Sequence, residues 1–234
     1  MSLMYGCTRL RDACDWKPIV GAKNWRPGKS AFELAHSWQC SDDFPPAVRR
    51  MLNSACPDKF EGLAINLRMV EWPVRLDSDD GPSMNDLMIW GENANDQRIV
   101  IAVEGKAAEY FGPTIKEWIK KPKNPTNRIN RLDCLNRELC TGFCRDDEIR
   151  YQLLHRTASA ILEARFVGAV AALVLIHSFA KSDRNWADYC TFLECALPKA
   201  QTPKRGEFQR CRDDFAQGLE LYFAWVDEQP IGGR

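Results

Sequence analysis

The fold class is decided by two apolar stretches, Pro-Ser-Met-Asn-Asp-Leu-Met-Ile-Trp at 82–90 and Ile-Val-Ile-Ala-Val-Glu-Gly-Lys at 99–106. Residues 87–90 form a short apolar run, and residues 98–103 are rich in the β-branched side chains that favour strands. The turn-forming residues 91–96 separate the two runs. The pattern therefore predicts two antiparallel strands joined as a hairpin.

This hairpin is expected to bring two acidic residues together. Residues at equal distances from the centre of a hairpin turn lie opposite each other. Asp86 and Glu104 lie at equal distances before and after position 95, which is inside the predicted turn. Glu104 and Lys106 are two residues apart on one strand, so their side chains project from the same face. We expect two carboxylates and one ammonium group to cluster at one end of the hairpin.

Such a cluster has chemical consequences. Both acids border long apolar runs, where a charge is unfavourable unless a partner or a cation compensates it. Two carboxylates beside a backbone carbonyl form a hard oxygen site that suits Mg²⁺ or Mn²⁺. A Lys next to such an ion can stabilise developing phosphoryl charge or orient an attacking water.

Elements on both sides of the hairpin can be predicted from periodicity and capping residues. Ser30 and Glu33 have the spacing of a capping box that begins a helix over 31–38. Strand alternation continues through 62–76. The remaining expected elements are helices near 45–53, 114–120, 127–140, 147–165 and 184–196, a buried strand at 168–176 and a strand at 219–226.

Asp86, the apolar strand after it and the Glu104-x-Lys106 strand end together resemble the core of the PD-(D/E)xK nucleases. The resemblance covers about residues 30–180, and the stretch is similar to an uncharacterised bacterial group of that superfamily. It implies an α/β fold, bordering on α+β, with a three-layer core in which helices flank a central mixed sheet. We expect one domain over 1–234, with residues 181–234 adding a helix and a strand to this core.

The resemblance also implies roles for individual residues. Asp86 and Glu104 would bind Mg²⁺ or Mn²⁺ with the Gly105 carbonyl as a third ligand, and Lys106 would assist attack on a phosphodiester of nucleic acid, with DNA expected. One departure is that the family's Pro directly precedes its Asp, whereas Asn85 stands there in this chain and Pro82 lies four residues before Asp86.

Further site candidates lie outside the hairpin. Gln152 and Arg156 are four residues apart on one helix face, where they could hold a phosphate or could simply face solvent. Several exonuclease-like branches of the superfamily that this chain resembles carry a Gln and an aromatic residue at this spacing, so the resemblance is partial here. Glu33 is a candidate metal ligand as well as a capping residue. Glu71 is a further candidate for an acidic residue of the metal site. The other expected substrate-binding residues are Ser83, Asn85, Lys116 and Lys120.

Aromatic, imidazole and thiol side chains have structural as well as functional interpretations. Trp118 lies among lysines and could stack on a base, although anchoring its helix is the favoured role. The three His residues are expected to be packed side chains. Most of the ten Cys are expected to be free thiols, and the close pairs 140/144 and 190/195 are the alternative metal ligands.

The overall charge balance conceals two opposed segments. The 234 residues contain 32 basic and 32 acidic side chains, which argues against a protein that grips polyanions through bulk positive charge. Residues 71–96 nevertheless carry seven acids and one base, and residues 114–137 carry seven bases and two acids. An acidic strip beside a basic helical segment suits the binding of a cation next to a phosphate backbone.

The chain begins without a secretory pattern, and its longest apolar run, 166–176, is shorter than the ~20 residues of a membrane helix. We therefore expect a cytoplasmic protein without membrane contact, and the oligomeric state stays open, a homodimer included. Three interpretations of function remain: a metal-dependent nuclease, a non-catalytic nucleic-acid-binding or interaction module, and an unrelated α/β protein whose acid pair is structural.

Overall fold

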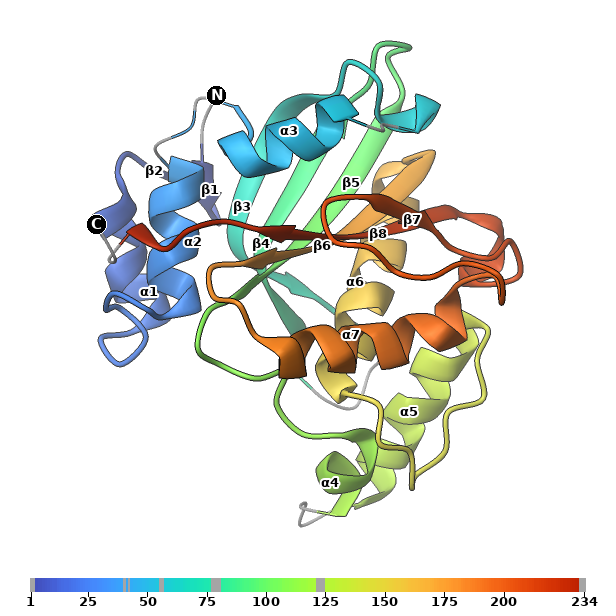
Figure 1. Ribbon diagram of the computed structural model, residues 1–234. Helices are drawn as coiled ribbons and strands as arrows, with labels where there is room; N and C mark the ends of the chain where they lie inside the picture. Colours follow the sequence, from blue (N-terminus) through green and yellow to red (C-terminus); the bar gives the residue numbers. More distant parts are fainter. Residues whose placement is uncertain are drawn as a thin grey trace.

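The computed structural model describes residues 3–39, 41, 43–54, 57–76, 81–120 and 125–231. Within these ranges, one eight-stranded mixed sheet has the strand order β2-β1-β3-β4-β5-β6-β8-β7 (Figure 1). The strands are β1 (Leu3–Tyr5), β2 (Thr8–Leu10), β3 (Ala64–Val74), β4 (Ser83–Glu92), β5 (Arg98–Lys106), β6 (Ala171–Ser178), β7 (Phe208–Arg210) and β8 (Glu220–Asp227). The α-helices are α1 (Lys17–Val20), α2 (Ser30–Gln39), α3 (Pro46–Ser54), α4 (Ile115–Lys120), α5 (Pro125–Leu139), α6 (Tyr151–Val167) and α7 (Asp183–Ala196).

The strand directions determine which edge of the sheet carries the strand ends that matter for the site. β3, β4 and β5 form an antiparallel meander, whereas β5, β6 and β8 are parallel to one another. The carboxyl ends of β5, β6 and β8 therefore meet at one edge. Ligands of open α/β sheets commonly bind at this kind of edge.

Helices cover both faces of the sheet. On one face, alternate β5 residues such as Val100 and Ala102 pack in a core with α5, α6 and α7. On the other face, Ile99 and Ile101 pack in a second core with α2 and α3. Because both faces are buried, β5 and β6 are almost continuously apolar. The predicted three-layer α/β class, with a central mixed sheet between helices, is confirmed.

The predicted elements are present with shifted ends. The hairpin strands extend to 83–92 and 98–106, and the helix predicted from 147 begins at Tyr151. β8 pairs in parallel with β6, so the 181–234 extension continues the same sheet. The three-residue strands β1, β2 and β7 were not predicted, because they are too short to show alternation.

The predicted capping box at Ser30 is wrong. Ser30 already belongs to α2, and the Glu33 carboxylate instead accepts the backbone N–H groups of Gly28 at 2.8 Å and Ile231 at 2.7 Å. Glu33 is fully buried, so its carboxylate ties the C-terminal segment to α2.

Two findings bear on the wider expectations. No helix in the described part of the chain is long and apolar enough to cross a membrane. The eight described cysteines are free thiols, and Cys40 and Cys56 lie outside the described residues.

Candidate active site

The ends of β4 and β5 bring the predicted acids together. The β4–β5 register pairs Leu87 with Val103, so Asp86 and Glu104 occupy the next opposed positions. The backbone N–H of Gly105 donates to Asp86 Oδ2 at 2.9 Å, which fixes the Asp86 carboxylate against the end of β5. The hairpin geometry expected from the sequence is therefore present.

Lys106 is held beside Glu104 by a short hydrogen-bond chain. Lys106 Nζ donates to Glu104 Oε1 at 2.6 Å and to Gln152 Oε1 at 3.0 Å. Gln152 Nε2 donates in turn to Glu104 Oε1 at 2.8 Å. Lys106 is only 4% exposed, so its ammonium group occupies one defined position rather than sampling solvent.

Arg156 is the second cation of the cluster and is 1% exposed. Its Nε and Nη2 both donate to Glu104 Oε2, the former at 2.7 Å. Nη1 donates to the Met84 carbonyl at 2.6 Å, and Nη2 lies 3.4 Å from Asp86 Oδ1. A single guanidinium nitrogen therefore bridges the two acids, and α6 supplies both Arg156 and Gln152 to the site.

These contacts leave Glu104 without free acceptor capacity. A carboxylate offers about four lone pairs, two on each oxygen. Lys106 and Gln152 occupy Oε1, and the two Arg156 nitrogens occupy Oε2. A metal ion could reach Glu104 only if one of these donors moved. Asp86 differs, because its side chain is 27% exposed and accepts one short hydrogen bond, from Gly105.

Glu71 places a third carboxylate next to Asp86 and Glu104, in a row across neighbouring strands. The β3–β4 register pairs Val70 with Leu87 and Trp72 with Asn85, so Glu71 falls level with Asp86. Its φ of 47° is left-handed, which is uncommon for a residue with a side chain. No hydrogen bond or ion pair from the described residues reaches its carboxylate. Glu71, Asp86 and Glu104 thus lie on three neighbouring strands.

The charges in this row are not balanced. Burial, followed by the charge of Glu104, raises the pKa of Asp86 to about 6. Burial, followed by the charge of Asp86, raises the pKa of Glu71 to about 7. Burial also acts to raise the pKa of Glu104, but Arg156 and Lys106 outweigh it and lower this pKa to about 2. Three carboxylates share two buried cations, so either a bound proton or one further cation balances the charge of the cluster.

The cluster opens into a cavity of about 470 Å³. Strand-end residues Glu71, Asp86, Glu104 and Lys106 line it on one side. The other walls come from α2, from the beginning of α6 and from the loop at 109–113. A larger cavity of about 800 Å³ lies between α3 and the ends of β6 and β8, but none of the clustered acids lines it. The smaller cavity is therefore the candidate active site.

Several predicted site residues are placed elsewhere. Glu33 is fully buried, does not line the cavity and accepts one backbone N–H on each carboxylate oxygen, so its contacts are those of a structural residue and not of a metal ligand in this cavity. Asn85 is fully buried and donates to the Trp72 carbonyl at 3.0 Å, because successive strand residues face opposite sides and Asn85 turns away from the Asp86 side. Ser83 Oγ lies 2.8 Å from His155 Nδ1. Neither Ser83 nor Asn85 lines the cavity.

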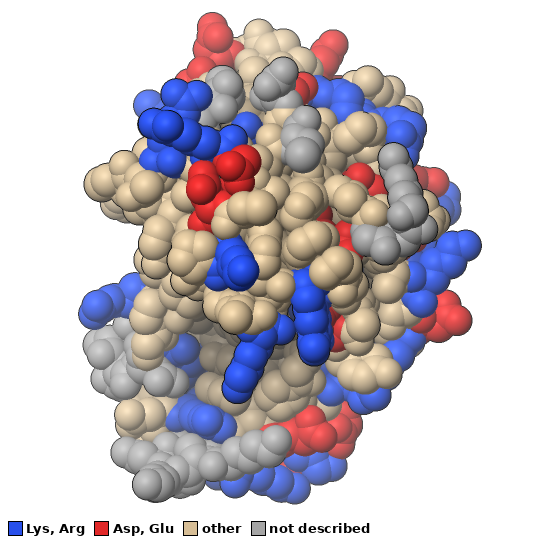
Figure 2. Space-filling view, turned by 90° about the vertical axis from the view of Figure 1, so that its left-hand side faces the viewer, with Lys and Arg blue, Asp and Glu red and all other residues tan. Residues whose placement is uncertain are grey.

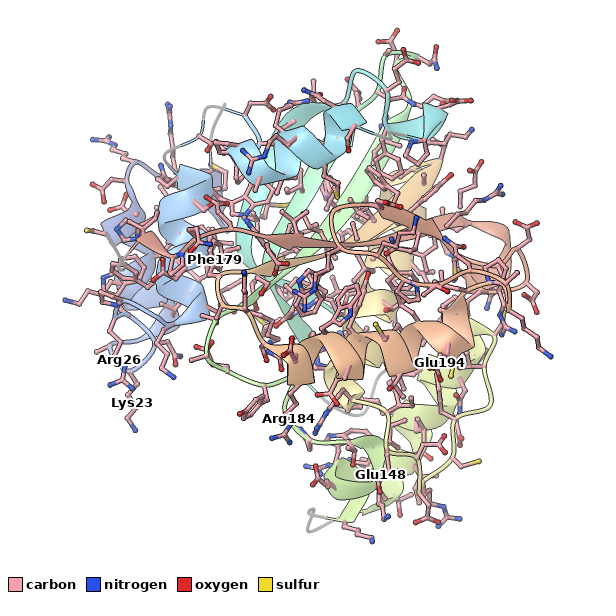
Figure 3. The ribbon with its side chains drawn as sticks, viewed as in Figure 1. Lys23, Arg26, Glu148, Phe179, Arg184 and Glu194 are labelled. Atoms are coloured by element: carbon pink, nitrogen blue, oxygen red, sulfur yellow. The ribbon has the colours of Figure 1, made fainter. Side chains whose placement is uncertain are left out.

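Lys116 and Lys120, predicted to bind substrate, lie away from the cavity. Lys116 Nζ donates to Glu148 Oε1 at 2.7 Å, beside α4, where Figure 3 labels Glu148. Lys120 is exposed at the end of the same helix, and neither lysine lines the cavity. Trp118 stacks on Tyr151 with ring centroids 3.8 Å apart, which agrees with the favoured anchoring role. Lys121, Lys123, Asp77, Asp79 and Asp80 lie outside the described residues.

His155 lines the cavity, although the sequence did not single it out as a site residue. Its hydrogen bond to Ser83 has the partners of a nucleophile–base pair. Burial, followed by the charge of Arg156, lowers the pKa of His155 to about 3. So weak a base cannot activate a hydroxyl near neutral pH, and Ser83 does not face the cavity. We assign this pair a structural role.

A metal site is not preassembled here. Among the described residues, no group of three or more His, Cys, Asp or Glu side chains has the arrangement of a metal centre. The donor set still fits a hard divalent ion in two respects. Asp86 presents carboxylate oxygen to the cavity, and the two buried cations compensate only two of the three carboxylates when all three are ionised. Glu104 could join only after losing one of its four donors.

One family model matches residues 9–230, and it is described as a domain of unknown function, DUF6946. No curated protein and no solved structure matches the chain.

Proposed function

Because the chain belongs to the DUF6946 family, whose description gives no activity, we propose from the site that this protein is a metal-dependent phosphodiesterase that cleaves nucleic acid, with DNA as its first expected substrate. The observation that carries the proposal is the buried Glu104–Lys106 pair, set beside Asp86 at the wall of a cavity. The resemblance to PD-(D/E)xK nucleases supports it. The free thiols of the described cysteines favour a reducing compartment such as the cytoplasm.

Lys106 is the residue best placed to act on a phosphate. Its ammonium group lines the cavity and is fixed by Glu104 and Gln152. An ammonium held in this way can donate to a phosphoryl oxygen as negative charge develops, without first reorganising. It can equally orient the water whose oxygen forms the new bond to phosphorus as the bond to the ester oxygen breaks.

Asp86 is the residue best placed to hold Mg²⁺ or Mn²⁺, with Glu104 as a second ligand after a donor leaves and the Gly105 carbonyl as the third ligand implied by the resemblance. When bound, such an ion supplies Lewis-acid polarisation of water and of the phosphoryl group. Arg156 compensates the acids from behind the cavity wall and keeps them in place when no ion is bound.

The proposal is tested with labelled single-stranded and duplex DNA and RNA, each incubated with Mg²⁺, with Mn²⁺ or with EDTA. We expect metal-dependent cleavage by the natural chain and a loss of at least about 100-fold in Asp86→Asn, the range in which loss of an electrostatic catalytic group falls. Asp213→Asn is the matched control, because the Asp213 side chain is 88% exposed. Equal cleavage by both variants would show that the Asp86 carboxylate, and therefore this cavity, does not carry out the reaction.

A second candidate function rests on the saturation of Glu104. A site whose central acid is occupied by four donors also suits a protein that binds nucleic acid without cleaving it. Calorimetric titration with Mn²⁺ separates the two candidates. Binding that is present in the natural chain and lost in Asp86→Asn favours the phosphodiesterase, and no binding in either favours the non-catalytic module.

A further inference from the structure

Tyr110 stands at the same cavity and has no part in the chemistry described above. It lines the cavity together with Asp86 and Lys106, yet 53% of its surface is exposed. A single exposed aromatic residue on a surface needs no explanation in general. Its position beside the candidate catalytic residues makes its surroundings informative.

The loop that carries Tyr110 is anchored on both sides. Before it, the Glu109 carboxylate accepts the backbone N–H groups of Ser30 at 3.1 Å and Ala107 at 3.2 Å. Asn185 Nδ2 donates to the Glu109 carbonyl at 2.8 Å. After it, Arg150 Nη1 donates to the Gly112 carbonyl at 2.9 Å. Contacts from α2, from α7 and from Arg150, the residue before α6, thus fix the backbone on both sides of Tyr110.

One side of the ring is covered by a cation. The Arg184 guanidinium lies 4.1 Å from the Tyr110 ring centroid. Arg184 is exposed at the beginning of α7 and has no ion pair with any described residue. An Arg on one side of an aromatic ring, with much of the ring still exposed, resembles the surfaces on which proteins stack nucleobases.

Other unpaired cations surround this entrance. Lys23 and Arg26 are exposed on the segment before α2, whose Asn24 lines the cavity, and neither has an ion pair among the described residues. Figure 3 places them across from Arg184, with the loop at 107–113 between. Figure 2 looks onto this side of the molecule and shows Lys and Arg side chains projecting over a recessed area. Phosphates entering the cavity would therefore meet positive charge on two sides.

We infer that Tyr110 is a stacking platform for an unpaired nucleobase next to the phosphodiester in the cavity, so that the substrate is a single strand. The inference rests on the proposed function. A base inside a duplex has both faces covered by its neighbours, whereas a base in a single strand can turn one face to a protein ring. Arg184, Lys23 and Arg26 then contact the backbone phosphates on either side.

The test measures binding without cleavage. Fluorescence anisotropy in EDTA compares a labelled 12-nucleotide single strand with the matching blunt duplex. We expect the natural chain to prefer the single strand and Tyr110→Ala to weaken single-strand binding about tenfold, within the range for loss of one stacked base. Tyr110→Phe keeps the ring and should bind within about twofold of the natural chain, and duplex binding should change little in either variant.

Tyr5→Ala is the matched control, because Tyr5 is 43% exposed at the end of β1 and does not line the cavity. Thermal unfolding verifies that each variant is folded, and Arg184→Gln gives an independent reading, with single-strand binding weakened about threefold. The inference is overturned if Tyr110→Ala binds the single strand like the natural chain, if it loses single strand and duplex equally, or if the natural chain does not prefer the single strand.

Failure of this inference and failure of the proposed function give different results. Tyr110-dependent single-strand binding without any cleavage in Mg²⁺ or Mn²⁺ would support the stacking role of Tyr110 and contradict the proposed phosphodiesterase activity. Metal-dependent cleavage at the same rate on single strand and duplex, unaffected by Tyr110→Ala, would support the proposed phosphodiesterase activity and contradict the stacking role of Tyr110.

Discussion

Arg156 is a buried cation with two acidic partners, and this arrangement makes the site sensitive to its loss. Replacing Arg156 by Met leaves Glu104 buried with only Lys106 and Gln152 as donors. Breaking a buried pair by removing one partner costs about 3–5 kcal/mol, because the other charge stays buried. We predict a loss of this size in the free energy of unfolding of Arg156→Met, measured by urea denaturation.

Arg210→Met is the control for this variant. Arg210 lies 3.0 Å from Asp213 in an exposed pair, and such pairs contribute roughly 0–1 kcal/mol. Equal stability losses in Arg156→Met and Arg210→Met would show that the Arg156 network does not hold the acids in place.

Glu71 should give stability a pH dependence of defined sign. Its pKa rises from an ordinary 4.5 to about 7 on folding, so folding favours its protonated form. That contribution is fully present below about pH 4.5 and is lost as the pH rises through about 7. We predict that Glu71→Gln, measured in EDTA by urea denaturation, is more stabilised relative to the natural chain at pH 8 than at pH 5. An unchanged difference between the two pH values would contradict the burial of this charge.

Part of the site could be predicted from residues alone. Asp86 and Glu104 followed from counting outward from one turn, and Lys106 followed from strand alternation. Glu71 was only an outside candidate, because its left-handed φ interrupts the alternation of β3. Tyr110 could not be predicted, because its place at the cavity depends on contacts from three segments that are distant in the sequence.

Among the elements, the β3–β4–β5 meander positions the acids, and its close spacing depends on Gly91. A Cβ added at Gly91 would lie 2.5 Å from the Ala64 carbonyl oxygen and 3.1 Å from a Leu63 methyl carbon. The β3–β4 register shifts between Ile65 and Leu67, directly beside this contact. Overpacking of this kind costs about 1–3 kcal/mol.

We therefore predict that Gly91→Ala lowers the midpoint of thermal unfolding, whereas Gly142→Ala, with open space around the added carbon, leaves it nearly unchanged. A Gly91→Ala variant as stable as the natural chain would mean that β3 and β4 can separate locally without cost.

Elements were predictable where several residues repeat a pattern. The long strands and the long helices were expected near their observed positions, since their alternation or helical spacing extends over many residues. The capping box failed for a tertiary reason, because burial of Glu33 against Gly28 and Ile231 overrides the local pairing with Ser30.

For the whole molecule, zero net charge predicts that binding of the proposed nucleic-acid substrate is modest and local. Each phosphate contact adds about 0.7 to the slope of log affinity against log salt for a single strand. We predict that the triple variant Lys23→Gln, Arg26→Gln and Arg184→Gln lowers the magnitude of this slope by about 2. Anisotropy titrations between 50 and 300 mM NaCl, roughly the range of large salt effects, measure it. An unchanged slope would show that these three cations do not contact the phosphates.

If the cluster of Asp86, Glu104 and Lys106 performs phosphodiester cleavage, loss of the Lys106 charge should abolish it. Lys106→Met and Lys116→Met remove the same charge from the chain, one inside the cavity and one in an ion pair with Glu148 beside α4. Rates of metal-dependent cleavage of one labelled single strand should fall by at least about 100-fold in Lys106→Met and stay within about twofold of the natural chain in Lys116→Met. Equal rates in the two folded variants would show that Lys106 takes no part in cleavage.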